Sequence, residues 1–220
     1  MRTEAQLRVH DLLRVMDAGA IRFDDPPPPW AQRRVTQAPW VVARRAPARQ
    51  GWLAAGLRGQ LRSERCAIWI AESAIEKVIS PEDLVFCGAW NRHIRSTDLP
   101  VPAAIAALPA VAAVLNGHLP AAAWGPTGSV GLQLADREPW VMASSDLDIM
   151  MRSPAPLAKA LARTLHRSLS RLEARVDLLI ETPFGGIALA DWAFTDGPCL
   201  LRTDLGPRLV IDPWAAAIGV

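Results

Sequence analysis

The chain has 220 residues, of which 50% are hydrophobic and 21% are charged, so it can bury a core and is not a disordered segment. Its net charge of +2 is uneven, since residues 1–98 carry 15 Lys and Arg against 11 Asp and Glu, whereas residues 99–220 carry 9 against 11. This imbalance is too small and too dispersed to indicate a nucleic-acid-binding protein. The most apolar stretch, residues 99–124, is broken by four prolines and does not predict a membrane span.

The cysteines and the N-terminus indicate a cytoplasmic protein. Cys66, Cys87 and Cys199 are widely spaced and include no CxxC pair, so neither a zinc site nor a disulfide framework is expected. Glu4 and Asp11 lie where a signal peptide would have its apolar core, so no export is expected. We therefore expect free thiols in a reducing compartment.

Several short elements are expected in the first half of the chain. They are a helical segment over residues 4–17, a stiff polyproline loop over 24–30, strands at 40–43 and 66–70 with an apolar run at 53–57 between them, and a helix starting at Ser80-Pro81. A polar break at Ser96-Thr97-Asp98 indicates a domain boundary, which gives an N-terminal domain over residues 1–98 and a second domain over residues 99–220.

The second half predicts an α+β domain in which helices cover a mixed sheet. Its expected elements are an alanine-rich helix at about residues 101–116, strands at 130–134 and 146–151, a helix from Pro156 with leucines every three or four residues, and a hairpin of strands 176–181 and 187–192 around Pro183–Gly186. The first domain is expected to be smaller and of the α/β class.

The chemistry is concentrated in a glycine–serine turn and a later Asp-x-Asp. Gly128-Ser129 offers backbone N–H groups and a hydroxyl to phosphate oxygens, and Asp146 and Asp148 follow in an apolar run. On a strand, carboxylates at i and i+2 point to the same face. Two such carboxylates can hold Mg²⁺, a hard cation that prefers oxygen ligands and keeps substrate phosphates in its shell. The pattern therefore predicts metal-dependent phosphoryl or nucleotidyl transfer.

A third carboxylate is expected on a neighbouring strand, to complete the metal site. Asp177 has apolar residues on both sides and is our choice, with Glu181 and Asp191 as the alternatives. Arg58, Arg62 and Arg65 recur at helical spacing, which by itself indicates a solvent-exposed helix face.

Several of these motifs together resemble the phosphoribosyl-dephospho-CoA transferases, the holo-acyl-carrier-protein synthases of malonate decarboxylase. The resemblance covers almost the whole chain. It is carried by His10–Leu13, Pro39–Arg45, Gly56–Arg65, Ser80–Leu84, Trp124–Leu134, Ser145–Asp148, Glu181–Gly186 and Asp191-Trp192. Trp-Gly-Pro-Thr-Gly-Ser followed by Ser-Asp-Leu-Asp is the most specific combination.

The resemblance implies a catalytic half similar to the polymerase-β-type nucleotidyltransferase fold. It implies 2′-(5″-triphosphoribosyl)-3′-dephospho-CoA as donor, a serine of the acyl-carrier protein subunit of malonate decarboxylase as acceptor, and pyrophosphate as leaving group. Asp146, Asp148 and Asp177 would be catalytic and hold Mg²⁺. Gly128, Ser129, Arg58 and Arg62 would bind the donor. The interval between Gly128-Ser129 and Asp146 is long enough for an extra strand, so the helix that usually follows the turn is not carried over.

Two other functions remain open from the sequence. One is a nucleotidyltransferase that uses ATP or another nucleotide on a protein or small molecule, and the other is a non-catalytic carrier-binding module. Arg44, Arg45 and Arg65, in the more basic half, are candidates to receive an acidic carrier protein.

Overall fold

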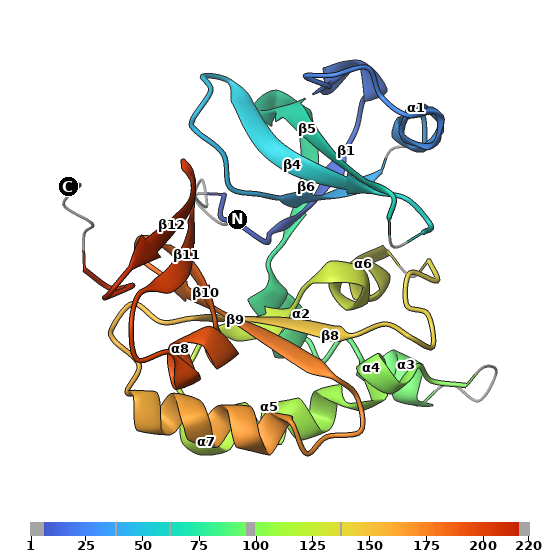
Figure 1. Cartoon of the computed structure of the whole chain (residues 1–220). Coiled ribbons are helices and arrows are strands. Elements are labelled where there is room, and N and C mark those ends of the chain that lie inside the picture. The colour runs from blue at the N-terminus through green and yellow to red at the C-terminus, as the bar shows by residue number, and fades with distance from the viewer. Residues whose placement is uncertain (1–6, 38, 62, 96–99, 137, 216–220) are drawn as a thin grey trace. The chain divides into compact units, whose positions relative to one another are not determined.

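The computed structural model describes residues 7–37, 39–61, 63–95, 100–136 and 138–215. The chain divides into two compact units, Met1–Ser80 and Pro81–Val220, each built around its own six-stranded sheet (Figure 1). The boundary lies before the one predicted at residue 98. The physical reason is that helix α2 (Pro81–Phe86) packs against strand β7 (Trp124–Pro126) and so belongs to the second unit.

The N-terminal unit is an antiparallel β-sheet in the strand order β2-β5-β4-β3-β1-β6. Its elements are β1 (Leu12–Val15), η1 (Ala18–Ala20), β2 (Ile21–Arg22), α1 (Pro29–Val35), β3 (Trp40–Ala43), β4 (Trp52–Arg58), β5 (Arg65–Ala71), η2 (Glu72–Ala74) and β6 (Ile75–Ile79). All of its strand pairs are antiparallel. The unit therefore differs from the α/β domain that the sequence suggested.

The helix predicted over residues 4–17 is wrong in the part that the structure describes. Residues 12–15 form β1, which pairs with β3 on one side and with β6 on the other. Leu13 and Val15 lie in the core of this unit, together with Ile68 and Ile70 of β5. The two-residue spacing of Leu13 and Val15 suits a strand, and pairing on both edges outweighs the helical spacing of the leucines.

The C-terminal unit has a mixed sheet in the order β12-β11-β10-β9-β8-β7. Its further elements are α3 (Asn91–Arg95), α4 (Ala103–Ala106), α5 (Leu108–His118), α6 (Gly128–Asp136), β8 (Leu147–Arg152), α7 (Lys159–Leu169), β9 (Val176–Thr182), β10 (Gly185–Ala188), α8 (Leu189–Phe194), β11 (Cys199–Thr203) and β12 (Gly206–Val210). Strands β8 and β9 run parallel, with α7 as the crossover between them, and the other pairs are antiparallel. This confirms the predicted α+β class and the mixed sheet.

Alternation along β8 assigns the two faces of this sheet. Leu147, Ile149 and Met151 are buried and point to one face, while Asp148 and Arg152 point to the other. Figure 1 shows α5 and α7 on one side of the sheet and α6 on the other. Because Asp148 lies beside the start of α6, the polar side chains of β8 belong to the α6 side.

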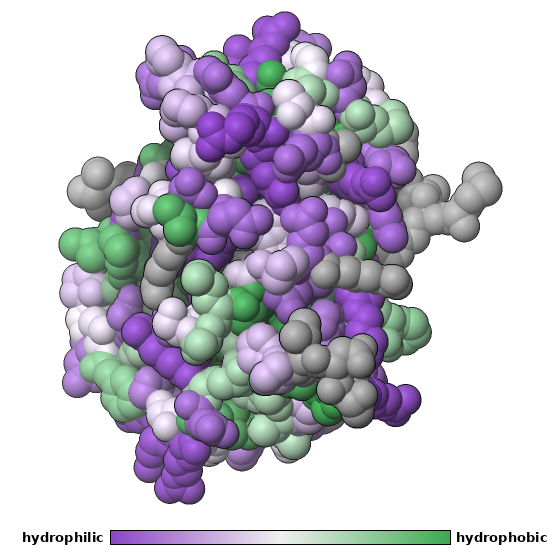
Figure 2. All heavy atoms as spheres, turned by 90° about the vertical axis from the view of Figure 1, so that its right-hand side faces the viewer, coloured by the Kyte–Doolittle hydropathy of each residue, from purple (hydrophilic) through white to green (hydrophobic). Residues whose placement is uncertain are grey.

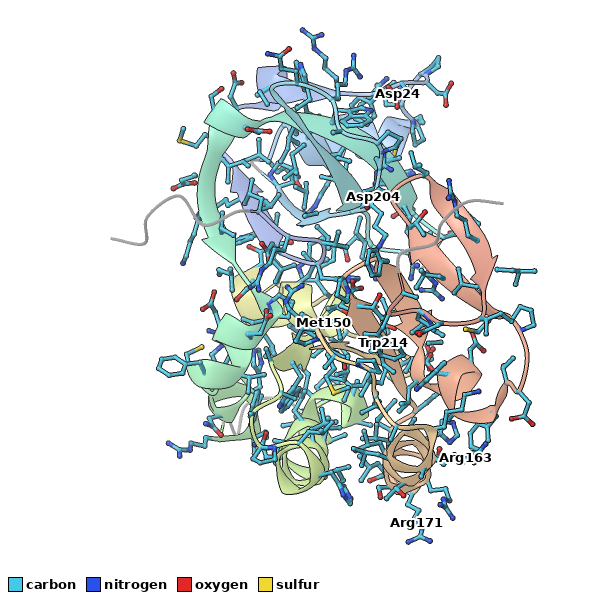
Figure 3. The ribbon with its side chains drawn as sticks, turned by 90° about the vertical axis from the view of Figure 1, so that its left-hand side faces the viewer. Asp24, Met150, Arg163, Arg171, Asp204 and Trp214 are labelled. Atoms are coloured by element: carbon cyan, nitrogen blue, oxygen red, sulfur yellow. The ribbon has the colours of Figure 1, made fainter. Side chains whose placement is uncertain are left out.

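Helix α7 confirms the leucine periodicity from the sequence. Leu165 and Leu169 are buried, whereas Arg171, just after the helix, points away from the sheet (Figure 3). Arg163 is half-buried, and its Nε donates to the carbonyl oxygen of Ala193 in α8 over 2.8 Å. Figure 3 also places Met150 inside the unit, and this residue is fully buried. The helix predicted at about residues 101–116 is present as α4 and α5, with Pro109 in the first turn of α5.

One predicted strand of this unit is wrong, and the predicted hairpin is confirmed only as far as Ala188, the end of β10. Residues 130–134 lie inside helix α6, and residues 189–192 of the predicted second hairpin strand lie inside α8. Val130, Leu132 and Leu134 alternate with Gly131 and Gln133, which suggested a strand, but all five residues are buried. A helix that is buried on all sides need not show a 3.6-residue hydrophobic period in its sequence. The local alternation of residues 130–134 therefore led to the wrong prediction of a strand.

The surface of the chain is mixed. On the side shown in Figure 2, hydrophilic and hydrophobic side chains are interspersed. Among the described residues, no helix has both the length and the apolar character needed to cross a bilayer.

Candidate functional site

Glycine is required at two positions next to the turn between β7 and α6, one within β7 and one at the first residue of α6. A Cβ atom on Gly125 would lie 2.0 Å from the carbonyl oxygen of Pro81, at the start of α2. Gly128 has φ of +59°, the left-handed region that favours glycine, and a Cβ there would lie 2.2 Å from Oδ2 of Asp148. The second contact means that the Asp148 carboxylate lies directly against the backbone of the turn.

Helix α6 begins at this turn, so its positive end lies beside Asp148. The N–H of Thr127 donates to the carbonyl oxygen of Asp148 over 2.8 Å, and the N–H of Gly131 donates to Thr127 over 2.9 Å. The unsatisfied N–H groups of a helix N-terminus favour an anion such as phosphate. Gly128 is half-buried and Ser129 is buried, so the backbone of Gly128 is the more open part of the turn.

Asp148 and Asp177 occupy paired positions in the two parallel strands. The register of β8 and β9 sets Asp148 opposite Asp177, and Asp146 lies two residues before Asp148, just outside β8. Residues at paired positions point to the same face, so both carboxylates lie on the side of α6. Asp177 is half-exposed, and its carboxylate lies 3.3 Å from Nη2 of Arg175. This is an exposed ion pair, which holds the carboxylate weakly.

The alternatives for the third carboxylate lie elsewhere. Glu181 is buried and is paired in register with Arg152, four residues farther along the strands. Four residues of strand span about 13 Å, too far to share an ion with Asp148. Asp191 lies on α8 and acts electrostatically on Cys199 of β11. Only Asp177, of the three candidates, is paired with Asp148.

Asp146, Asp148 and Asp177 stay the predicted magnesium ligands. In the residues that the structure describes, no three His, Cys, Asp or Glu side chains are close enough to be recognised as a metal-binding group. Asp148 and Asp177 nevertheless supply two carboxylates at paired positions beside a helix N-terminus, and Asp146 adjoins them. Carboxylate oxygens, with substrate phosphate, are the ligands that Mg²⁺ prefers.

The predicted substrate arginines lie in the N-terminal unit. Arg58 ends β4 and pairs directly with Arg65, the first residue of β5, so the segment is a hairpin and not the helix that the spacing indicated. Arg62 lies outside the described residues. Residues 55 and 57 of β4 are in the core, so Arg58 and Arg65 lie on the opposite face of this sheet.

A cluster of arginines and tryptophans extends over that same face. The guanidinium of Arg22 lies 4.2 Å from the ring centroid of Trp52, and that of Arg49 lies 5.3 Å from the ring of Trp69. The indole N–H of Trp69 donates to Asp24 over 2.8 Å. Stacking of this kind fixes a guanidinium, and Arg49 also forms an ion pair with Asp24 over 3.6 Å.

Arg44 is held by the protein itself. Its Nε donates to the carbonyl oxygen of Ala55 over 3.1 Å, and its Nη1 donates to that of Arg45 over 3.2 Å. Its guanidinium also lies 5.6 Å from the ring of Trp69. Among the arginines expected to receive a carrier protein, Arg65 is exposed to solvent. The guanidinium of Arg44 already donates hydrogen bonds within the N-terminal unit.

Two of the three cysteines are poor nucleophiles. Burial is the main cause that raises the pKa of Cys66, and Asp25 adds to it. Burial also raises the pKa of Cys199, against the smaller opposing effects of a backbone hydrogen bond and Lys159. A raised thiol pKa leaves little thiolate near neutral pH, so neither residue suits covalent catalysis.

Comparison with known proteins assigns this arrangement to a class of transferases. The model described as the phosphoribosyl-dephospho-CoA transferase MdcG C-terminal domain matches residues 92–213, and that of the MdcG N-terminal domain matches residues 8–81. The chain belongs to the phosphoribosyl-dephospho-CoA transferase family.

Individual relatives match over nearly their full length and carry the same name, phosphoribosyl-dephospho-CoA transferase. The protein of Pseudomonas putida strain GB-1 is 42% identical over 95% of this chain and 96% of the relative, and that of strain W619 is 41% identical over 93% and 94%. The protein of Azotobacter vinelandii is 40% identical over 93% of both chains. No solved structure matches the chain.

Proposed function

We propose that this protein transfers the phosphoribosyl-dephospho-CoA group from 2′-(5″-triphosphoribosyl)-3′-dephospho-CoA to a serine of the acyl-carrier subunit of malonate decarboxylase, with release of pyrophosphate. The transferase name of its relatives supports the group transferred. The single observation that carries the chemistry is the position of Asp148, between the Gly128 turn and Asp177.

The chemical step is a substitution at the α-phosphorus. The serine Oγ of the carrier forms a new P–O bond, the bond to pyrophosphate breaks, and the serine proton passes to a carboxylate. Asp177 is the proposed proton acceptor, because it is half-exposed and adjoins Asp148. The departing pyrophosphate carries the electrons of the broken bond.

The residues of the turn would bind the leaving group. The N-terminus of α6 at Gly128 would place N–H donors and the positive end of the helix dipole against the pyrophosphate oxygens. Ser129 would add a hydroxyl donor from the same turn. Arg58 and Arg62 are further candidates to contact the donor's phosphates, as the family resemblance implies.

Asp146, Asp148 and Asp177 would hold Mg²⁺. When bound, the ion would neutralise the charge that develops on the phosphate oxygens. These carboxylates would otherwise repel the donor, because its negatively charged phosphate oxygens would approach them.

The order of elements supports a variant of the polymerase-β-type nucleotidyltransferase fold for the C-terminal unit. Strand β7 leads through the glycine–serine turn into α6, and Asp146 and Asp148 then lie just before and near the start of β8. The helix after the turn, which was not expected from the sequence, brings the chain closer to that pattern.

The test is mass spectrometry of the apo carrier subunit after incubation with this protein, Mg²⁺ and the triphosphoribosyl donor. We expect the carrier mass to rise by one phosphoribosyl-dephospho-CoA group and pyrophosphate to appear in equal amount. The matched control is the Asp148→Asn variant, which should leave the carrier unmodified.

Other outcomes would replace the proposal. An adenylyl or other nucleotidyl adduct formed with ATP would indicate a general nucleotidyltransferase. An unmodified carrier that binds the protein tightly with or without Mg²⁺ would indicate a non-catalytic binding module.

A further inference from the structure

Gln133 is a buried polar residue of α6 that the proposed chemistry does not use. The residue is 8% exposed, and its Oε1 accepts two hydrogen bonds from consecutive backbone N–H groups. The donors are Trp140 at 3.0 Å and Val141 at 2.8 Å. A side-chain amide oxygen has two lone pairs, so these two donors use its full capacity.

The two amides belong to the segment that leads into Asp146. After Val141 this segment makes a turn, in which the N–H of Met142 donates to Oγ of Ser145 over 2.9 Å and the N–H of Ser145 returns to the carbonyl of Met142 over 3.0 Å. Asp146 follows directly. The part of the segment that the structure describes has no helix or strand, so side-chain hydrogen bonds fix its path.

The two residues after Asp146 are held by the residue before β9 and the residue before α6. Leu147 donates to the carbonyl of Arg175 over 2.8 Å, and the carbonyl of Asp148 accepts from Thr127, the residue before α6. The segment before Asp146 is therefore hydrogen-bonded to Gln133 of α6. The residue Asp148, after it, is hydrogen-bonded to Thr127, just before α6. Figure 1 shows α6 beside β8, with the segment returning from the far end of the helix.

We propose that Gln133 is a positioning residue, which fixes Asp146 relative to the glycine–serine turn. Because α6 starts at Gly128 and carries Gln133 near its C-terminal end, one rigid helix sets both the proposed phosphate-binding turn and the first carboxylate of the Asp-x-Asp. This inference rests on the proposed function, since it concerns the geometry of that site. Gln133 itself does not touch the substrate.

The decisive variant is Gln133→Met, which keeps the volume and removes the acceptor for both amides. The matched control is Leu132→Met, at the neighbouring buried position of the same helix, where no acceptor is lost. The conservative variant Gln133→Glu retains an oxygen acceptor for both donors. All three are compared with the wild-type chain.

Three measurements separate positioning from simple stability. Hydrogen exchange of peptides over residues 138–146 reports the two hydrogen bonds, binding of Mn²⁺ alone reports the carboxylates, and steady-state transfer reports kcat and KM. For Gln133→Met we expect faster exchange confined to residues 138–146, weaker Mn²⁺ binding by about tenfold, and a lower kcat with a nearly unchanged donor KM. Such a tenfold change corresponds to about 1.4 kcal/mol. Gln133→Glu should recover part of the kcat, and Leu132→Met should match the wild type.

The inference is overturned if Gln133→Met exchanges faster over residues 138–146 but binds Mn²⁺ and transfers the group like Leu132→Met. It is also overturned if exchange rises throughout the unit, since Gln133 then supports the fold in general. A wild-type chain that neither binds Mn²⁺ nor modifies the carrier would instead refute the proposed function, and this inference with it.

Discussion

The backbone of Gly128 and the carboxylate of Asp148 are in direct contact, because a Cβ atom at position 128 would lie 2.2 Å from Oδ2 of Asp148. This contact joins the two sequence motifs, which are separated by the whole of α6 and the following segment. Because Gly128 has no side chain, it leaves room for the Asp148 carboxylate and would also let a phosphate approach the backbone.

Asp148→Asn and Asp146→Asn should each abolish transfer. Loss of a metal ligand should remove several kcal/mol of transition-state stabilisation, which corresponds to roughly a 10³-fold loss of rate. The fold should remain intact or become slightly more stable, because one negative charge is removed from a carboxylate cluster. Thermal unfolding and the carrier assay measure both effects, with Asp204→Asn, at the exposed β11–β12 turn, as the matched control. Near-normal turnover in either variant would eliminate the metal site.

Asp→Asn substitutions at the candidate positions can identify the third carboxylate of the proposed metal site. Asp177→Asn should lose activity about as severely as Asp148→Asn, because the two residues are paired in register. Asp191→Asn on α8 should stay near the wild-type rate. Mn²⁺ titration of the free protein gives a second readout. A severe loss in Asp191→Asn with an active Asp177→Asn would reverse the assignment.

Gly128→Ala should damage both stability and activity. The left-handed backbone costs a non-glycine residue about 1–2 kcal/mol, and the new Cβ must displace the Asp148 carboxylate. The matched control is Gly117→Ala in α5, where nothing lies within 4 Å of the added atom and helix propensity predicts a gain of about 0.5–1 kcal/mol. Chemical denaturation and transfer assays on both variants would distinguish them. An active, stable Gly128→Ala protein would contradict the close packing at this turn.

Ser129→Ala should lower the transfer rate by roughly ten- to a thousandfold, as expected for the loss of one hydrogen bond to developing charge. Stability should change little by comparison with Gly128→Ala. The rate and the melting temperature are measured together on the same preparation. If the variant unfolds while the surviving folded fraction keeps the full rate, Ser129 is a structural residue of the turn.

Arg22 and Arg65 are the exposed arginines best placed to receive an acidic carrier, because both lie on the face of the N-terminal sheet opposite its core. The double variant Arg22→Glu/Arg65→Glu should raise the KM for carrier, leave the KM for donor unchanged, and reduce the salt dependence of the reaction. Arg171→Glu/Arg208→Glu makes the same charge change on exposed residues of the other unit and should have little effect. A selective rise in the donor KM would show that these arginines bind phosphate instead.

The sequence named Gly128, Asp148 and Asp177 as candidate site residues, and their roles stay predictions. The structure sets Asp148 against Gly128 and opposite Asp177. The register that pairs Asp148 with Asp177 depends on α7 as a parallel crossover, which no local pattern encodes.

The errors arose where burial or tertiary contact overrides local preference. Val130–Leu134 alternates like a strand, yet a fully buried helix allows any apolar pattern, and Gln133 was assigned no role because its partners lie seven and eight residues away. The boundary at residue 98 followed a polar stretch, whereas the contact of Pro81 with Gly125 assigns α2 to the C-terminal unit.

That contact has a practical consequence for isolating the C-terminal unit. Strand β7 is the last strand at its side of the sheet, and α2 packs against it. A fragment that begins at residue 99 would lack α2 and would expose Gly125. The edge strand β7 could then pair with strands of other molecules and cause aggregation. A fragment that begins at Pro81 is longer, keeps this cover and should remain monodisperse during purification.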